Sequence, residues 1–217
     1  MAQWDAKDKT FLITGGASGL GAEYARAFLD HGAKNVAILD IAEELGKATA
    51  ERLNKVYGNK AVFIKCDVSK EEDIASAFDS VLAQFKQIDV IINNAGVMID
   101  SPSIWRTASD INWADSFYEN TGIRVMSMCL GSTDTPLVQN LETKAWDPKL
   151  GNKMAAAVED GYICQTRESA VAALLDMFKT GAPATVWMSV DNKPVQNITA
   201  AIDRAFKDFE SVIAGTD

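Results

Sequence analysis

The sequence predicts an α/β protein with a Rossmann-like, doubly wound parallel sheet. Short apolar runs alternate with stretches of helical periodicity over the first hundred residues. A glycine cluster, TGGASGLG at residues 14–21, separates the first apolar run from the first helical stretch. Residues 88–96 begin with a nearly continuous apolar run, which is typical of a strand covered on both faces. With 217 residues, of which 47% are apolar, we expect a single domain over residues 1–217.

The first part of the chain is expected to contain four strands and three helices, joined by right-handed crossovers. His31 and Gly32 suit the end of the first helix, as a last-turn imidazole and a C-terminal glycine. Ser69 and Glu72 have the spacing of a capping box, which predicts that the third helix begins at Ser69. The strands are expected at 10–14, 35–40, 61–68 and 88–96, and the helices at 22–32, 41–58 and 69–85.

The second part of the chain shows a weaker alternation. Thr166 and Ser169 are rival N-caps for a helix with a clear apolar stripe, and the pattern does not decide between them. Residues 131–160 are expected to form a long loop with irregular helix. The other expected elements are a helix within 104–118, a strand at 122–129, a helix at 165–181, a strand at 184–190 and a closing helix at about 198–214.

Composition narrows the class of partner. The net charge of −9 disfavours nucleic acid and anionic membranes as partners. Three cysteines without paired spacing indicate reduced thiols, and a single histidine disfavours a His/Cys metal site; we expect no metal. The N-terminal residues lack the pattern of a signal peptide, and no apolar run reaches the length of a membrane helix. A cytoplasmic location is therefore expected.

The glycine cluster predicts a dinucleotide site. Glycines at Gly15, Gly19 and Gly21 permit a tight turn and a close approach of the backbone to a pyrophosphate, which the following helix N-terminus would favour. Asp40 lies 19 residues after Gly21, at the end of the second strand, where its carboxylate can accept hydrogen bonds from ribose hydroxyls. Because that carboxylate would repel a 2′-phosphate, NAD is favoured over NADP. In the alternative interpretation the glycines only turn the chain and Asp40 caps the next helix.

Five segments together resemble the short-chain dehydrogenase/reductase family, and most of all its insect alcohol dehydrogenase and 15-hydroxyprostaglandin dehydrogenase-like branch. They are TGGASGLG at 14–21, Asp40, CDV at 66–68, NNAG at 93–96 and GIRVMSMCLGSTDTPL at 122–137. The resemblance implies an NAD-dependent oxidoreductase of secondary alcohols or hydroxy-fatty acids. One departure is Leu130-Gly131, where the family usually has Pro-Gly.

The resemblance also implies which residues contact the cofactor. Asp67 and Val68 would lie by the adenine, residues 93–96 would line the cofactor cleft, and Gly131, Ser132 and Thr135 would contact the nicotinamide. The full set of expected cofactor-binding residues is Gly15, Ser18, Gly19, Leu20, Gly21, Asp40, Asp67, Val68, Asn94, Ala95, Gly96, Gly131 and Thr135.

The catalytic centre of that family is absent from the sequence. It consists of a Tyr-x-x-x-Lys pair, a Ser on the preceding strand and often an Asn on an earlier helix. Four residues after the four tyrosines the chain has Phe28, Ala61, Gly122 and Thr166, so none is followed by the lysine. Asn112, in DIN at 110–112, is the only surviving match to a catalytic residue.

Only 35 positions separate Gly96 from Gly131, too few for the helix, strand and catalytic helix that the family places there. SFYENTGIRV at 116–125 resembles the stretch that follows the catalytic helix. The simplest interpretation is an internal loss between about Trp113 and Phe117, which would also remove a helix that the family uses for subunit packing and so puts an oligomer in doubt.

Residues 97–121 are long enough for a crossover, so we expect a healed sheet of six strands instead of seven, with 122–129 pairing beside 88–96. Two functions remain open. One is an NAD-dependent oxidoreductase, impaired or inactive in this chain, that would act on a small apolar alcohol or ketone. The other is a noncatalytic NAD-binding or interaction protein. A third, minor possibility is catalysis by another acid, for which Tyr118 is the nearest candidate.

Overall fold

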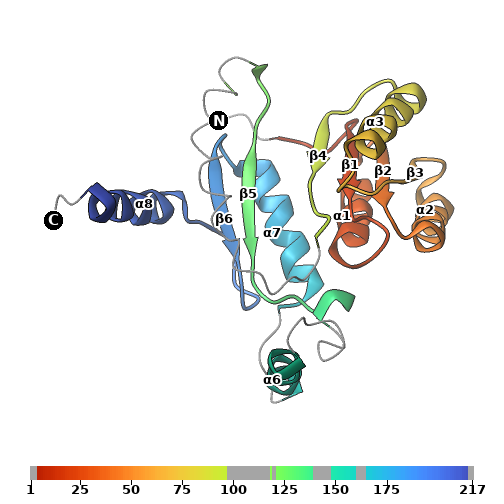
Figure 1. Cartoon of the computed structure of the whole chain (residues 1–217). Helices are drawn as coiled ribbons and strands as arrows, with labels where there is room; N and C mark the ends of the chain where they lie inside the picture. Colours follow the sequence, from red (N-terminus) through yellow and green to blue (C-terminus); the bar gives the residue numbers. More distant parts are fainter. Residues whose placement is uncertain (1–3, 97–117, 119–120, 139–147, 160–164, 215–217) are drawn as a thin grey trace. The chain divides into compact units, whose positions relative to one another are not determined.

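The computed structural model describes residues 4–96, 118, 121–138, 148–159 and 165–214 (Figure 1). These residues belong to two compact units, each described by itself below. The N-terminal unit comprises Asp5–Ile99 with Asp134–Ala145, and the C-terminal unit comprises Met1–Trp4, Asp100–Thr133 and Trp146–Asp217. Asn112 and the proposed junction at 113–117 lie outside the described residues.

The N-terminal unit contains a parallel sheet of four strands in the order β3-β2-β1-β4. In this sheet Phe11 lies opposite Val36 on one side and Val90 on the other. This is the Rossmann-like arrangement that the sequence predicts. The strands are β1 (Thr10–Thr14), β2 (Asn35–Asp40), β3 (Ala61–Lys65) and β4 (Val90–Ile92).

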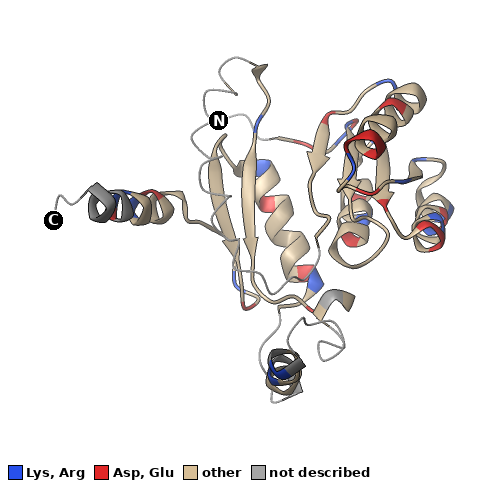
Figure 2. Ribbon diagram, viewed as in Figure 1, with Lys and Arg blue, Asp and Glu red and all other residues tan. Residues whose placement is uncertain are grey.

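Helices cover both faces of this sheet, because successive side chains of a strand point to opposite faces. Phe11 of β1 stacks on Phe28 of α1 (Gly19–Asp30), with ring centroids 4.1 Å apart. The next residue, Leu12, belongs to an apolar cluster with Val81 of α3 (Glu71–Phe85). Helix α2 (Glu43–Tyr57) packs on β3. Charged residues of this unit lie on its helices, its turns and the ends of its strands (Figure 2), and the strand interiors are apolar.

The capping box predicted at Ser69 is wrong. Helix α3 begins at Glu71, its N-cap is Lys70, and no side chain caps it. The Ser69 hydroxyl instead donates to Oδ1 of Asp67 at 2.7 Å. The nearby carboxylate therefore takes the hydroxyl that the capping box requires. At the end of α1, His31 is the C-cap and Gly32 has a φ of +85°, as the sequence predicts.

The C-terminal unit has a sheet of its own, in the order β5-β6-β7. Strand β5 (Met126–Leu130) is parallel to β6 (Thr185–Ser189), and β7 (Gln196–Asn197) is antiparallel to β6. The described strands form one sheet of four strands and one sheet of three strands. Strand β4 is an edge strand of the first sheet, and strand β5 is an edge strand of the second, where its neighbour is β6.

Three helices are described in the C-terminal unit: α6 (Pro148–Glu159), α7 (Arg167–Thr180) and α8 (Thr199–Ala214). Thr166 is the N-cap of α7, since its Oγ1 accepts from the backbone N–H of Ser169 at 3.2 Å. Helix α6 is regular, although it lies in a stretch predicted to be irregular. None of the described helices combines the length and apolar composition needed to cross a bilayer.

Candidate functional site

The glycine-rich turn follows β1 and leads into α1. Gly15 has a φ of +65°, a conformation that glycine adopts without strain. A Cβ on Gly15 would lie 2.8 Å from the Cα of Ala95, and a Cβ on Gly21 would lie 2.2 Å from the carbonyl oxygen of Gly15. Side chains at these two positions are therefore excluded by backbone atoms of the turn and of the segment after β4.

Asp40, at the end of β2, holds this turn in place. Its Oδ2 accepts from the backbone N–H of Ala17 at 3.0 Å, and its Oδ1 accepts from the N–H of Ala42 at 2.9 Å. The Ala17 carbonyl in turn accepts from the buried hydroxyl of Thr49 at 2.8 Å. Since Ala42 is the N-cap of α2, Asp40 bonds the backbone just before that helix but is not its cap. Each carboxylate oxygen has a further lone pair with which to accept a ligand hydroxyl.

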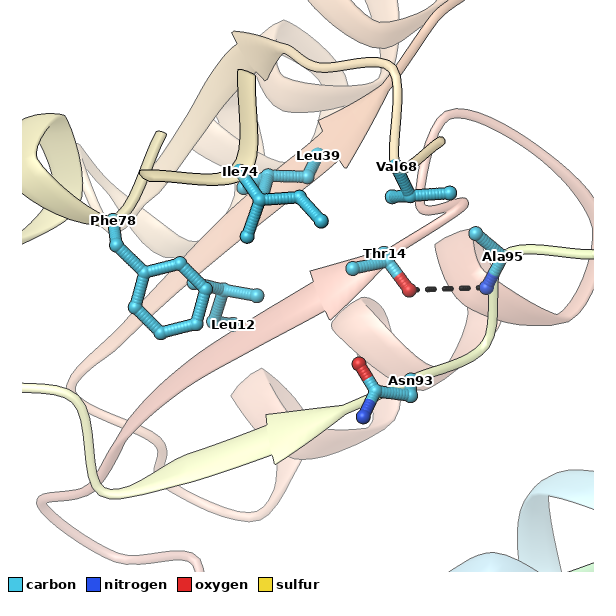
Figure 3. Close-up of a pocket in the computed structure, with 8 residues that line it drawn as sticks. All are labelled: Leu12, Thr14, Leu39, Val68, Ile74, Phe78, Asn93 and Ala95. Atoms are coloured by element: carbon cyan, nitrogen blue, oxygen red, sulfur yellow. Dashed lines mark hydrogen bonds between the residues drawn. The ribbon is translucent and has the colours of Figure 1, made fainter. Parts of the chain in front are cut away.

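The NNAG segment is tied to the same turn. The hydroxyl oxygen of Thr14 accepts from the N–H groups of Asn94 and Ala95 at 3.1 and 3.0 Å. Figure 3 shows the bond from Ala95. The side-chain amide of Asn94 donates to the carbonyls of Thr14 and Gly15 at 3.0 and 3.2 Å. The sequence pattern did not predict that Thr14 and Thr49 support the turn. The sequence feature that could have indicated Thr14 is a hydroxyl side chain at the last strand position before the glycines.

The first turn of α1 has free donors. Its N-cap, Ser18, makes no side-chain capping bond. Within the part of the chain that the structure describes, the N–H groups of residues 19–21 have no recorded acceptor. Unsatisfied N–H groups and the positive end of the helix dipole suit an anion. The residues present therefore fit the pyrophosphate of a dinucleotide.

A pocket of about 210 Å³ opens beside the turn, at the carboxyl ends of β1, β2 and β4. Thr14, Val68, Asn93 and Ala95 gather at one end of it, while apolar side chains form the other (Figure 3). Ligand pockets usually measure about 300–1,000 Å³, so this one fits a single ring rather than a whole dinucleotide. Its complete lining is Leu12, Thr14, Leu39, Val68, Ile74, Phe78, Asn93 and Ala95.

Asp67 precedes the pocket residue Val68, and its carboxylate forms hydrogen bonds within its own loop. Its Oδ1 accepts from the hydroxyl and the N–H of Ser69 at 2.7 and 3.0 Å, and these bonds lower the pKa of the Asp67 carboxyl. The N–H of Asp67 donates to the carboxylate of Asp73 at 3.0 Å. Asp67 is therefore an anion that fixes the backbone next to the pocket.

The segment after β5 carries the residues expected at the nicotinamide. Gly131 donates its N–H to the carbonyl of Ser189 at 2.8 Å, and a Cβ on Gly131 would lie 2.8 Å from Cγ1 of Val190. Thr135 is buried and belongs to the N-terminal unit, where its Cβ lies 3.7 Å from the position that a Cβ on Gly19 would take. The structure thus brings Thr135 to the glycine-rich turn. Gly96 is exposed.

No described tyrosine has the surroundings of a catalytic acid. Tyr24 is buried in α1, and burial raises the pKa of its hydroxyl. Burial and a hydrogen bond to Asp30 raise the pKa of Tyr57 to about 12. Tyr118 is 36% exposed, and glycine rather than lysine follows it by four positions.

Comparison with known proteins identifies the family. The profile described as short chain dehydrogenase matches residues 9–120, which is more than half of the chain. The chain belongs to the short-chain dehydrogenase family. The family predicted from the glycine-rich turn, Asp40 and NNAG is therefore confirmed.

Curated relatives match part of this chain and part of their own length. The chain is 47% identical to tropinone reductase-like 1 of Erythroxylum coca over 90 residues, which cover 42% of this chain and 31% of that protein. It thus spans about a third of the length of the curated relatives it matches.

Solved structures share the fold at low identity. Levodione reductase aligns with a TM-score of 0.67 and 19% identity, covering 85% of this chain and 97% of that one. A 3-ketoacyl-(acyl-carrier-protein) reductase from Brucella melitensis, solved with NADH, aligns with a TM-score of 0.60 and 19% identity over 85% and 97% of the two chains. These likenesses agree with the Rossmann-like fold.

Proposed function

We propose that this chain binds NAD(H) through the glycine-rich turn of its N-terminal unit and that its oxidoreductase turnover is strongly reduced. The observation that carries the proposal is the first turn of α1, whose free N–H groups lie next to a turn that glycines and Asp40 shape. When bound, NAD(H) would accept or supply a hydride. The residues of the chain would hold and orient it.

The groups assigned to binding differ in what they recognise. The N–H groups at the start of α1 would stabilise the pyrophosphate by hydrogen bonds and by the helix dipole. The free lone pairs of Asp40 would accept ribose hydroxyls, and its charge would repel the 2′-phosphate of NADP. The pocket beside Val68 and Ala95 would receive the adenine ring. A short-chain dehydrogenase neighbour solved with NADH supports the choice of cofactor.

The reduced turnover rests on the proton that must accompany the hydride. A positioned acid or base contributes about 10²- to 10⁴-fold to such a reaction. The sequence contains no Tyr-x-x-x-Lys pair, and Asn112 is the only remaining match to the catalytic set. We propose that an internal loss removed the Ser and Tyr-Lys region, so proton transfer to or from a substrate oxygen lacks its usual group.

The ancestry of the chain suggests the substrate class. The resemblance to the insect alcohol dehydrogenase and 15-hydroxyprostaglandin dehydrogenase-like branch favours a secondary alcohol, a hydroxy-fatty acid or the matching ketone. A second candidate function is a noncatalytic NAD-binding or interaction protein in the cytoplasm. It is favoured by the same observation, since the free N–H groups of α1 and the turn shaped by glycines and Asp40 are present while the Tyr-Lys pair is absent from the sequence.

Binding is tested by titrating the protein with NADH and with NADPH and following the nicotinamide fluorescence. We expect saturable binding of NADH and weaker binding of NADPH. Asp40→Asn should lower the NADH affinity by about tenfold, as loss of a charged hydrogen-bond partner does, and narrow the preference over NADPH. Asp176→Asn removes an exposed carboxylate from α7 and should leave both affinities unchanged. Absence of NADH binding would refute the cofactor assignment.

Turnover is tested with the same preparation by following NADH formation from NAD and a secondary alcohol such as propan-2-ol. Binding without measurable turnover supports an inactive descendant or a binding protein. A rate within about tenfold of an intact family member would show that another acid replaces the missing tyrosine, because loss of the acid alone should cost more.

A further inference from the structure

Thr49 is a buried hydroxyl residue of α2 that bonds the glycine-rich turn, within the N-terminal unit. Its exposed fraction is 2%. Its Oγ1 donates to the carbonyl oxygen of Ala17 at 2.8 Å, thirty-two residues earlier in the chain. The same Oγ1 accepts from the guanidinium of Arg52 at 2.8 Å. Thr49 therefore links α2 to the turn that precedes α1.

The direction of both hydrogen bonds follows from the partners of Thr49. A guanidinium can only donate, and a backbone carbonyl can only accept. The hydroxyl of Thr49 has one hydrogen, so Arg52 must donate to its oxygen and that hydrogen must point to Ala17. Ala17 is 1% exposed, and among the described residues no other donor reaches its carbonyl. Thr49 thus satisfies a backbone acceptor that water does not reach.

The peptide group between Ala17 and Ser18 connects this bond to the start of α1. In a planar trans peptide the C=O and the N–H point in opposite directions. Because the Ala17 carbonyl faces Thr49, the Ser18 N–H faces away from it. Within the part of the chain that the structure describes, the Ser18 N–H has no acceptor, so it adds a donor to the free N–H groups of residues 19–21.

The preceding peptide group is held from the other side of the turn. The Ala17 N–H donates to Oδ2 of Asp40 at 3.0 Å, and the Gly16 N–H donates to the carbonyl of Leu39 at 3.3 Å. Ala17 is therefore fixed by its N–H to β2 and by its carbonyl to α2. These two bonds decide which side of the turn presents donors and which presents acceptors.

We propose that Thr49 is a positioning residue that keeps the Ala17 carbonyl turned to α2 and thereby aims the Ser18 N–H at the pyrophosphate of NAD(H). The assignment rests on the proposed function, in which the free N–H groups at the start of α1 hold the pyrophosphate. No contact with the cofactor is assigned to Thr49 itself. It acts through the peptide group between Ala17 and Ser18.

Loss of the hydroxyl should change the polarity of the turn. A buried carbonyl without a donor is costly, so the Ala17 carbonyl should rotate toward solvent. The rotation would bring a partial negative charge to the side of the turn that holds the phosphates and would take the Ser18 N–H away from them. Valine has the shape of threonine and a similar helix propensity, so Thr49→Val removes the hydroxyl with little effect on α2 itself.

The test compares ADP-ribose with adenosine, which has the same base and ribose but no phosphate. NMR titration of each variant with both ligands gives the two dissociation constants. In Thr49→Val the constant for ADP-ribose should rise about tenfold, as loss of a hydrogen bond to a charged group does, and that for adenosine should change less than about twofold. Thr49→Ser keeps the hydroxyl and should bind ADP-ribose within about threefold of wild type. Equal losses for both ligands in Thr49→Val, or no loss for ADP-ribose, would overturn the assignment.

Asn54→Leu is the matched control, on the same helix. The side-chain amide of Asn54 bonds the carbonyl and the N–H of Ala61 at 2.8 Å, so its loss should weaken the packing of α2 on β3. The ratio of the two dissociation constants should stay at its wild-type value. A change of that ratio as large as in Thr49→Val would show that loosening α2 is sufficient, and would refute a specific role of the hydroxyl.

The carbonyl ¹³C resonance of Ala17 gives a readout that needs no ligand. In Thr49→Val it should move upfield, because the carbonyl loses its hydrogen bond, and in Thr49→Ser it should stay. If Thr49→Val does not fold, Thr49→Cys, with a weak S–H donor, should give an intermediate shift and an intermediate affinity. An unchanged resonance would show that Thr49 does not orient this peptide.

The two proposals fail in different ways. If wild type does not bind ADP-ribose, the proposed function is refuted, and the link between Thr49 and the pyrophosphate is refuted with it. If wild type binds ADP-ribose and Thr49→Val binds it equally well, only the positioning role of Thr49 is refuted.

Discussion

Among the described residues, the two units of the chain differ in the large side chains that they bury most completely. In the N-terminal unit every residue of β1 is buried, and the largest fully buried side chains are apolar, such as Phe11, Phe28 and Leu12. In the C-terminal unit β5 is half-buried to exposed along its length, and the largest fully buried side chains are Gln165 and Ser189, which are both polar. The first unit is thus organised by packing and the second to a greater extent by hydrogen bonds.

Arg124 is a further example of hydrogen bonds that stabilise the C-terminal unit. Its guanidinium donates to the carbonyls of Phe178 and Gly181 at the end of α7 and lies 4.2 Å from the ring centroid of Trp4. Burial lowers the pKa of Arg124 to about 10, so it remains charged at neutral pH. The half-buried guanidinium of Arg124 stabilises the C-terminal unit through polar contacts with helix carbonyls, whereas apolar contacts stabilise the N-terminal unit.

The largest loss of stability is expected from a substitution in the tightly packed glycine-rich turn. Gly21→Ala should destabilise the N-terminal unit by about 3 kcal/mol, because the new Cβ would overlap the carbonyl oxygen of Gly15, a backbone atom. Urea unfolding followed by circular dichroism measures the loss. Gly32→Ala is the control: its φ is +85° and the atoms nearest to an added Cβ lie at an ordinary contact distance of 3.7 Å, so only backbone strain of about 1 kcal/mol is expected. Equal losses would contradict the steric account.

The C-terminal unit should depend most on Arg124. Arg124→Gln should cost about 2 kcal/mol, since it removes charged hydrogen bonds to helix carbonyls and the cation–π contact. Faster hydrogen exchange of the amides in α7 would report the loss. Arg26→Gln, in exposed ion pairs with Glu23 and Asp30, should cost less than about 1 kcal/mol. If the two substitutions lower the stability by the same amount, the C-terminal unit does not depend more on polar contacts than the N-terminal unit does.

A smaller difference is expected between two helix N-caps. Thr166→Ala should destabilise the C-terminal unit by about 1 kcal/mol, because the Thr166 hydroxyl satisfies the N–H of Ser169. Ser18→Ala should change stability by less than about 0.5 kcal/mol, because Ser18 makes no capping bond to α1. Thermal unfolding of both variants checks the pair. A large loss at Ser18 would mean that the α1 donors are not free for a ligand.

The smallest effect concerns acid stability at Asp67. Hydrogen bonds from Ser69 lower the folded-state pKa of this carboxyl below its unfolded value of about 3.9. The stabilisation is therefore fully present above about pH 4 and is lost as the pH falls through the folded pKa. Ser69→Ala should raise the pKa of Asp67 toward its ordinary value, which an NMR titration of the carboxyl carbon measures. An unchanged titration would contradict the role of the Ser69 hydroxyl.

Local sequence signals located most of the elements correctly. Strands β1 and β2 have the predicted bounds, because apolar residues fill them and a glycine turn or an aspartate ends them. The glycine-rich turn and Asp40 were identified for the same reason. Each of these features depends on residues that are neighbours in the sequence.

Other features depended on residues far apart in the chain. The choice of β6 as the neighbour of β5 is a tertiary one, which crossover length does not determine. Gln165 lies before a helix, where a polar residue predicts exposure, and only its partners at Gly131, Thr133 and Ser189 make it a buried residue. Ser69 had the right spacing for a cap, but a closer acceptor, Asp67, competes for its hydroxyl.

The bonds between Thr14 and the NNAG segment have a consequence for synthesis on the ribosome. The turn after β1 is made early, but the backbone and side-chain groups that complete it belong to residues about eighty positions later. Until residue 95 has left the exit tunnel, the nascent chain holds β1 without β4 and the turn without Asn94. Closing so long a loop is entropically costly, so the four-stranded sheet should be completed only at that point. The interval before it is when chaperones would be needed most.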